Sequence, residues 1–174
     1  MSTAEPPIQR YWKMSEANSL NGYWFDVLGW IAYNFAQLEG ASYLLIESLE
    51  QVPAVRDVCL SLGYAHRSKV AAGLVVAHVA ADAALASDWA SFWPRAIAAA
   101  PIRNKVLHNP LTKDLLAGEQ MEVDDGVRLR DTNRTILKLG SVQAYNSQLV
   151  ELKKELQDLL KRTPLPAPLS VQSA

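Results

Sequence analysis

Apolar residues recur at alternating steps of four and three between residues 22 and 51, and this spacing constrains the fold more than any other feature of the chain. Steps of four and three place side chains on one face of an α-helix. A helix with such a stripe buries it against other helices, so the sequence predicts a long helix in an antiparallel bundle. The stripe consists of Trp24, Leu28, Ile31, Phe35, Leu38, Ser42, Leu45 and Leu49.

Three further segments have helical patterns, which we expect at residues 64–86, 88–109 and 141–162. Ser87 or Asp88 can cap the start of the third helix. The chain has 174 residues, 49% of them apolar and only 8 of them Gly, which suits one helix-rich domain. The predicted class is therefore all-α, an antiparallel helical bundle of four main helices. The apolar stripe of the last helix is Val142, Tyr145, Leu149, Leu152, Leu156 and Leu159.

The helical pattern stops at about residues 111–140, where we expect a small β-hairpin insertion before the last helix. Asp125-Gly126 lies between short apolar runs and is typical of a hairpin turn, and Thr135 to Leu139 can add a third strand. The insertion is either a lid over a neighbouring site or an ordered connection. We assign the domain to residues 22–162, with an N-terminal arm at 1–21 and a Pro-rich flexible tail at 163–174.

Charge and cysteine content restrict the classes of function. The net charge is −1, so a nucleic-acid contact would have to be local rather than a broad basic surface. The single cysteine, Cys59, cannot form an internal disulfide, and no Cys/His cluster has the spacing of a zinc site. The first residues lack the apolar core of a signal peptide, and we expect a soluble, cytoplasmic protein with no membrane contact.

Polar groups able to do chemistry concentrate between Pro101 and Pro110. His108 falls in the last turn of the predicted helix, and Asn104 lies four residues earlier on the same face. Arg103 and His108 are five residues apart, about 140° around the helix axis. Only a long Arg side chain, or a second copy of the helix, could bring both groups onto one ligand. The segment either extends the third helix through a kink or forms a separate short helix.

Arg103, Asn104 and His108 in "RNKVLHNP" form an Arg-polar-x3-His motif that resembles the HEPN family. The resemblance in helix order covers roughly residues 22–162. The resemblance implies a helical bundle that acts as a homodimer. It also implies a metal-independent endoribonuclease that needs no cofactor. Its biological role would be that of a toxin with an antitoxin partner, or of a defence protein. By resemblance, Arg103 would steady the phosphate, Asn104 would orient, and His108 would act as acid or base.

Candidates for contacting the substrate are Lys105 and Asn109, beside the motif, and Glu39, on the first predicted helix. Glu39 lies at the edge of the first stripe, where it either faces solvent or points inward and holds Arg103. Three functions remain open: a ribonuclease, a non-catalytic nucleotide- or protein-binding module of the same fold, and a structural protein. In the last case Arg103 caps a helix or forms a salt bridge, and His108 and Asn109 bind carbonyls at a helix end.

Overall fold

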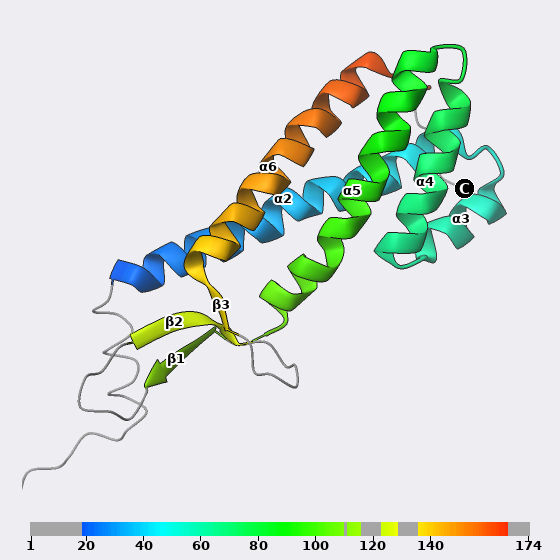
Figure 1. Ribbon diagram of the computed structural model, residues 1–174. Coiled ribbons are helices and arrows are strands. Elements are labelled where there is room, and N and C mark those ends of the chain that lie inside the picture. The colour runs from blue at the N-terminus through cyan, green and yellow to red at the C-terminus, as the bar shows by residue number, and fades with distance from the viewer. Residues whose placement is uncertain (1–18, 110, 116–122, 129–135, 167–174) are drawn as a thin grey trace, which may run out of the picture.

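The computed structural model describes residues 19–109, 111–115, 123–128 and 136–166, and it is mostly helical (Figure 1). The predominantly helical class predicted from the sequence is confirmed. The helices are α2 (Ser19–Leu49), α3 (Pro53–Ser61), α4 (Tyr64–His78), α5 (Ala83–Leu107) and α6 (Leu139–Arg162).

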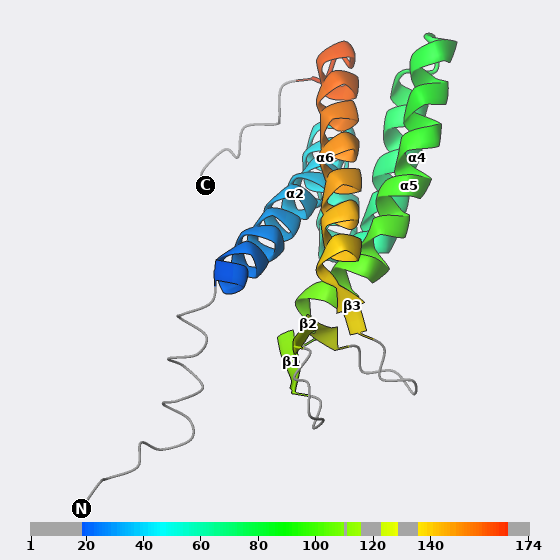
Figure 2. The same cartoon turned by 60° about the vertical axis from the view of Figure 1, so that its left-hand side comes forward.

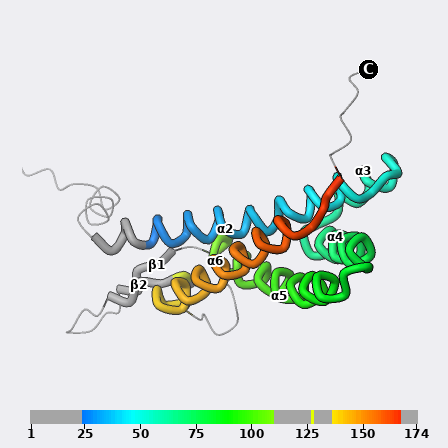
Figure 3. Tube along the Cα trace, turned by 90° about the horizontal axis from the view of Figure 1, so that it is seen from above, coloured from blue at the N-terminus to red at the C-terminus, as the bar shows by residue number. Residues whose placement is uncertain are grey.

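The long helix α2 is the common support of the fold, because α4, α5 and α6 all contact it. Figure 2 shows α4 beside α5, and α6 lying between α2 and α5. The view from above in Figure 3 shows α2 along one side of the molecule, with α5 and α6 running beside it. Most of the predicted stripe on α2 is buried, whereas Leu28 and Leu49 are only partly buried. The largest fully buried side chains include Trp24, Trp89, Trp93, Phe92, Ile31, Leu38 and Leu149.

The boundary between the second and third predicted helices is corrected by the structure. Helix α4 ends at His78, not near residue 86, and the chain turns before Asp82. The carboxylate of Asp82 accepts a hydrogen bond from the backbone N–H of Leu85 at 3.0 Å. Asp82 is therefore the N-cap, in place of the expected Ser87 or Asp88, which lie inside α5. Alanine-rich sequence on both sides of the turn hid its position, since alanine favours helix throughout.

Helix α5 continues through two internal prolines, Pro94 and Pro101, to Leu107. The motif segment is thus an extension of this helix and not a separate one. Burial explains why the prolines are tolerated, because Trp89, Phe92 and Trp93 are almost fully buried and fix α5 by packing.

Three short strands follow α5: β1 (Leu111–Leu115), β2 (Val123–Arg128) and β3 (Ile136–Lys138). They form an antiparallel sheet in the order β1-β2-β3. The predicted turn at Asp125-Gly126 is wrong, because both residues lie within β2, opposite Lys113 and Thr112 of β1. The Asp-Gly pair is typical of a turn only when it separates two strands. Here Val123 and Val127, on either side of the pair, belong to one strand that pairs on both edges.

The start of the predicted flexible tail is packed against the helices. Thr163 is buried, and its hydroxyl accepts a hydrogen bond from the indole N–H of Trp89 at 2.9 Å. His78 Nε2 lies 3.0 Å from the carbonyl oxygen of Pro164. The rest of the tail, from residue 167, and most of the predicted arm, residues 1–18, lie outside the described residues. No helix in the described part of the chain combines the length and apolar character needed to span a membrane.

Candidate functional site

The motif residues come together at the C-terminal end of α5 within one chain. Arg103 Nη1 donates a hydrogen bond to Asn104 Oδ1 at 3.0 Å and lies 3.4 Å from His108 Nε2. The Arg side chain therefore spans the angular separation between positions 103 and 108. Asn104 and His108 are exposed, so a ligand can reach this group of three side chains.

The contact between Arg103 and His108 defines the role that each nitrogen can take. A guanidinium carries only donors, so His108 Nε2 can accept from it only when that nitrogen is unprotonated. Such a nitrogen can remove a proton from a ligand hydroxyl placed beside Arg103.

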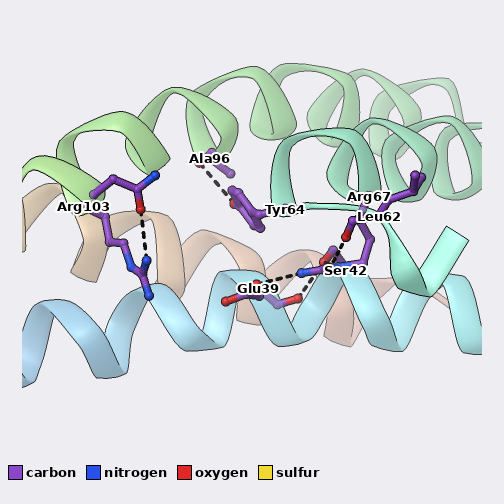
Figure 4. A network of polar contacts seen from close by, with 8 residues as sticks. Glu39, Ser42, Leu62, Tyr64, Arg67, Ala96 and Arg103 are labelled. Atoms are coloured by element: carbon purple, nitrogen blue, oxygen red, sulfur yellow. Dashed lines mark hydrogen bonds and ion pairs between the residues drawn. The ribbon is translucent and has the colours of Figure 1, made fainter. Parts of the chain in front are cut away.

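The guanidinium of Arg103 is anchored on α2. Its central carbon lies 5.3 Å from the centre of the Phe35 ring, and Phe35 is buried, so a cation–π contact holds the side chain. Figure 4 shows Arg103 extending from α5 toward α2. Arg103 Nε is buried and has no hydrogen-bond partner among the described residues. Buried donors are normally paired, which makes this group notable.

Two tyrosines from other helices bind carbonyls of α5 close to the motif. Tyr145 of α6 donates to the Ala99 carbonyl at 2.8 Å, and Tyr64 of α4 donates to the Ala96 carbonyl at 3.2 Å. Burial raises the pKa of the Tyr64 phenol to about 12. It raises the pKa of Tyr145 well above the usual range of a phenol. Both hydroxyls therefore remain donors and hold α5 in place.

Glu39 points inward, the second of the two alternatives left open by the sequence, but the cation that it binds is Arg67 of α4 and not Arg103. Arg67 Nη2 lies 2.8 Å from Glu39 Oε1, and its other nitrogens donate to Ser42 Oγ at 2.9 Å and to the Leu62 carbonyl at 2.6 Å. Arg67 is only 2% exposed, so these bonds satisfy a buried charge. Figure 4 shows the Glu39–Arg67 pair further along α2 from Arg103.

The two remaining candidates differ in their surroundings. Lys105 is exposed beside the motif. The side-chain amide of Asn109 donates to the Lys105 carbonyl at 2.6 Å, and this bond satisfies a carbonyl in the last turn of α5. Asn109 thus serves the helix end in this structure, as the structural alternative anticipated.

Sequence reasoning missed the parts that Phe35, Tyr64 and Tyr145 play around Arg103. Phe35 and Tyr145 were assigned to apolar stripes, and their spacing along the chain does not indicate which residue on α5 they meet. A tyrosine on a buried stripe does signal that its hydroxyl needs a partner. Its partner proved to be backbone, which sequence patterns do not reveal.

In the described part of the chain, no group of three or more His, Cys, Asp and Glu side chains is arranged to hold a metal ion. In comparisons with known proteins, no family model, curated protein or solved structure matches this chain.

Proposed function

We propose that this chain is a metal-independent endoribonuclease of the HEPN type. The observation that supports it most is the position of Arg103 Nη1, 3.0 Å from Asn104 Oδ1 and 3.4 Å from His108 Nε2. A permanent cation beside an imidazole is the pair of groups that phosphodiester cleavage by a 2′-hydroxyl requires. We assign α2, α4, α5 and α6 as the antiparallel bundle that carries this motif.

Each motif residue has a separate task in this proposal. Once the substrate phosphate binds the guanidinium in place of His108, Nε2 of His108 accepts the proton of the 2′-hydroxyl as the hydroxyl oxygen attacks the adjacent phosphorus. Arg103 stabilises the negative charge that grows on the phosphate oxygens, and Asn104 orients the guanidinium through Oδ1. The bond from phosphorus to the 5′-oxygen breaks, which leaves a 2′,3′-cyclic phosphate and a 5′-hydroxyl end. The leaving oxygen takes its proton from a protonated His108, supplied by a second copy, or from water.

The active form in this proposal is a homodimer in which two motifs share a cleft. Lys105 is exposed beside the motif and would contact the RNA backbone. With a net charge of −1, the chain would hold only a few phosphates at a time. A toxin or defence role, with a cognate antitoxin partner, is the biological setting that this chemistry suits.

Cleavage of a mixed RNA in the presence of a chelator tests the proposal. We expect the wild type to release 2′,3′-cyclic phosphate ends and His108→Ala to release none at an unchanged melting temperature. His66→Ala is the matched control, since His66 is an exposed histidine on a different helix, α4. Products with 3′-hydroxyl ends, or equal cleavage by His108→Ala, would overturn the assignment.

A non-catalytic module that binds a nucleotide or protein is the second candidate. The exposure of Asn104 and His108 favours it, because both side chains can bind a ligand without any turnover. If mixed RNA stays intact while a mononucleotide binds the wild type and not Arg103→Lys, the binding role replaces the enzymatic one.

A further inference from the structure

A groove of about 560 Å³ lies between α5 and α6 and is open to the surface. Its floor is apolar, with Ala98, Ala99 and Ile102 from α5 and Leu152 from α6. The three α5 positions are three and four residues apart, so they lie on one face of that helix. A volume of this size falls within the range of small-molecule sites, which is about 300–1,000 Å³.

The groove exists because α5 carries small side chains where it passes α6. Near the start of α5, Phe92 and Trp93 are almost fully buried and fill the space among the helices. Further along, Ala98 and Ala99 offer only methyl groups. The hydroxyl of Tyr145 on α6 donates to the Ala99 carbonyl at 2.8 Å, and this bond ties the two helices together beside the groove. The site is therefore formed before any ligand binds, as small-molecule sites usually are.

The charged side chains of the lining are already paired. Arg95 of α5 binds Glu155 of α6, and Glu151 binds Lys154 at 2.7 Å. A charged ligand would have to break one of these ion pairs to find a counter-charge, whereas an uncharged ligand leaves both intact. The lining is therefore complementary to an uncharged molecule.

Gln148 of α6 supplies a polar group that such a ligand can use. Its side-chain amide can both donate and accept a hydrogen bond, and it bonds to none of the described residues. The neighbouring hydroxyl of Ser147 differs, because it donates to the Gln143 carbonyl at 3.2 Å. Gln148 is thus the lining residue best suited to orient a ligand with a hydroxyl, carbonyl or N–H group.

The surroundings of the groove suit a small ligand better than a protein partner. Ile102, at 39% exposed, is the one large apolar side chain of the lining that is exposed. Lys105, Ser147 and Glu151 are exposed polar residues on the same two helices. A specific protein interface needs about 800 Å² on each partner, with an apolar centre. Here the apolar area is confined to the floor of the groove.

We propose that this groove binds an uncharged, largely apolar small molecule with one hydrogen-bonding group. The apolar part lies on Ala98, Ile102 and Leu152, and its burial supplies the affinity. The polar group contacts Gln148, which sets the orientation. Arg103 extends from α5 toward α2 and not toward α6, so the groove is separate from the motif (Figure 4). The inference therefore does not depend on the proposed ribonuclease.

Titration with N-phenyl-1-naphthylamine tests the groove. This probe is uncharged and aromatic, has a single N–H group, and fluoresces more strongly in apolar surroundings. We expect saturable binding to one site per chain. Anilinonaphthalene sulfonate has the same framework with an added sulfonate, and should bind at least about 10-fold more weakly. Absence of saturable binding, or a sulfonate that binds as tightly as the uncharged probe, would refute the proposal.

Ala98→Phe tests the position of the site. Ala98 is exposed, so a phenyl ring there should fill the groove without entering the core, and should raise the dissociation constant at least about 10-fold. Ala36→Phe is the matched control, because Ala36 is also an exposed helical alanine and lines a second groove, of about 240 Å³, between α2 and α6. Loss of binding by Ala36→Phe and not by Ala98→Phe would contradict the assignment.

Gln148→Leu tests the polar contact. This variant should bind N-phenyl-1-naphthylamine about 3–10-fold more weakly than the wild type does. It should not weaken binding of 1-benzylnaphthalene, in which CH₂ replaces the N–H, as measured by displacement of the fluorescent probe. Equal losses for the two ligands would remove Gln148 from the site.

Nuclear Overhauser effects locate the probe directly in chains with methyl-labelled isoleucine. We expect contacts from the aromatic protons of the probe to the Ile102 methyl groups. Ile31 and Ile46 are the internal controls, since both are fully buried in the core. Contacts to Ile31 or Ile46 in place of Ile102 would show that the probe enters the core, and would overturn the proposal.

Discussion

At the scale of single residues, specific partners hold the polar groups of Arg67 and Tyr64. Arg67 is paired with Glu39, while Tyr64 is bonded to a carbonyl of α5. Both residues belong to the first turn of α4, and together they tie this helix to α2 and α5. Arg103 differs, since its Nε has no such partner among the described residues.

Because of Tyr64, the folded protein should lose stability at alkaline pH. Its phenol has a pKa near 12 in the folded chain and about 10 when exposed. The folded state holds the proton more strongly, so this contribution is complete below pH 10 and is lost as the pH rises toward 12. We expect a loss on the order of 2 kcal/mol in the free energy of unfolding over that range. Urea denaturation at several pH values measures it, with Tyr64→Phe as the control that should show a shallower decline.

Substitution of Arg67 measures how much the buried ion pair and hydrogen bonds of this side chain contribute to stability. Arg67→Met removes the charge that Glu39 and the Leu62 carbonyl bind, and we expect a loss of about 2–4 kcal/mol in the free energy of unfolding. Arg95→Met is the control, because its ion pair with Glu155 is half-exposed and should contribute less than about 1 kcal/mol. Similar losses for the two variants in urea denaturation would show that burial does not strengthen the first pair.

At the scale of elements, helix ends decide how the site is presented. The start of α5 is set by Asp82, and its end carries Arg103, Asn104 and His108. Between them, buried Trp89, Phe92 and Trp93 hold the helix despite Pro94 and Pro101. The motif therefore projects from a helix that is fixed by packing rather than by its own helix propensity.

The N-cap of α5 gives an element-scale prediction. Asp82→Ala removes the acceptor of the Leu85 N–H and should cost about 1 kcal/mol of stability. Ser87→Ala should cost less than about 0.5 kcal/mol, since Ser87 lies inside the helix. Thermal unfolding monitored by circular dichroism compares the two. A larger effect at Ser87 would return the helix start to the position expected from the sequence.

The helical class could be predicted from the sequence, because apolar residues spaced as Ile31, Phe35 and Leu38 are, lie on one face of a helix and are buried there. It failed at the α4–α5 turn, where alanine on both sides gives no contrast. It failed again at Asp125-Gly126, because strand pairing with β1 depends on residues distant in sequence. Arg103, Asn104 and His108 could be selected from their types and spacing. Two contacts could not be predicted without knowing how α2 packs against its neighbours. One is the contact of Phe35 with Arg103, and the other is the binding of Glu39 by Arg67 and not by Arg103.

At the scale of the whole molecule, one core supports the site. The core connects α2, α4, α5 and α6, and Val127 of β2 joins it. Leu149 of α6 is fully buried in this core. The motif, by contrast, lies at a helix end with two exposed side chains, so stability and chemistry should separate under mutation.

Leu149→Ala tests this separation from the side of the core. We expect a loss of about 2–5 kcal/mol in the free energy of unfolding, because a cavity replaces the side chain. Val58→Ala, at an exposed position on α3, should change it by less than about 0.5 kcal/mol. The folded fraction of Leu149→Ala should keep the activity of the wild type per folded molecule. A specific loss of RNA cleavage there would show that core and motif are coupled.

The central claim is that Arg103 and His108 together cleave RNA. The most direct test is to measure the rate of RNA cleavage by Arg103→Lys, His108→Ala and the double variant, each compared at an equal concentration of folded protein. If the two side chains act as one unit on a phosphodiester, each single variant loses most of the rate, because lysine lacks the planar fork of arginine. The double variant is then no slower than the slower single variant. Losses that multiply in the double variant, or a His108→Ala rate equal to that of the wild type, would contradict the claim.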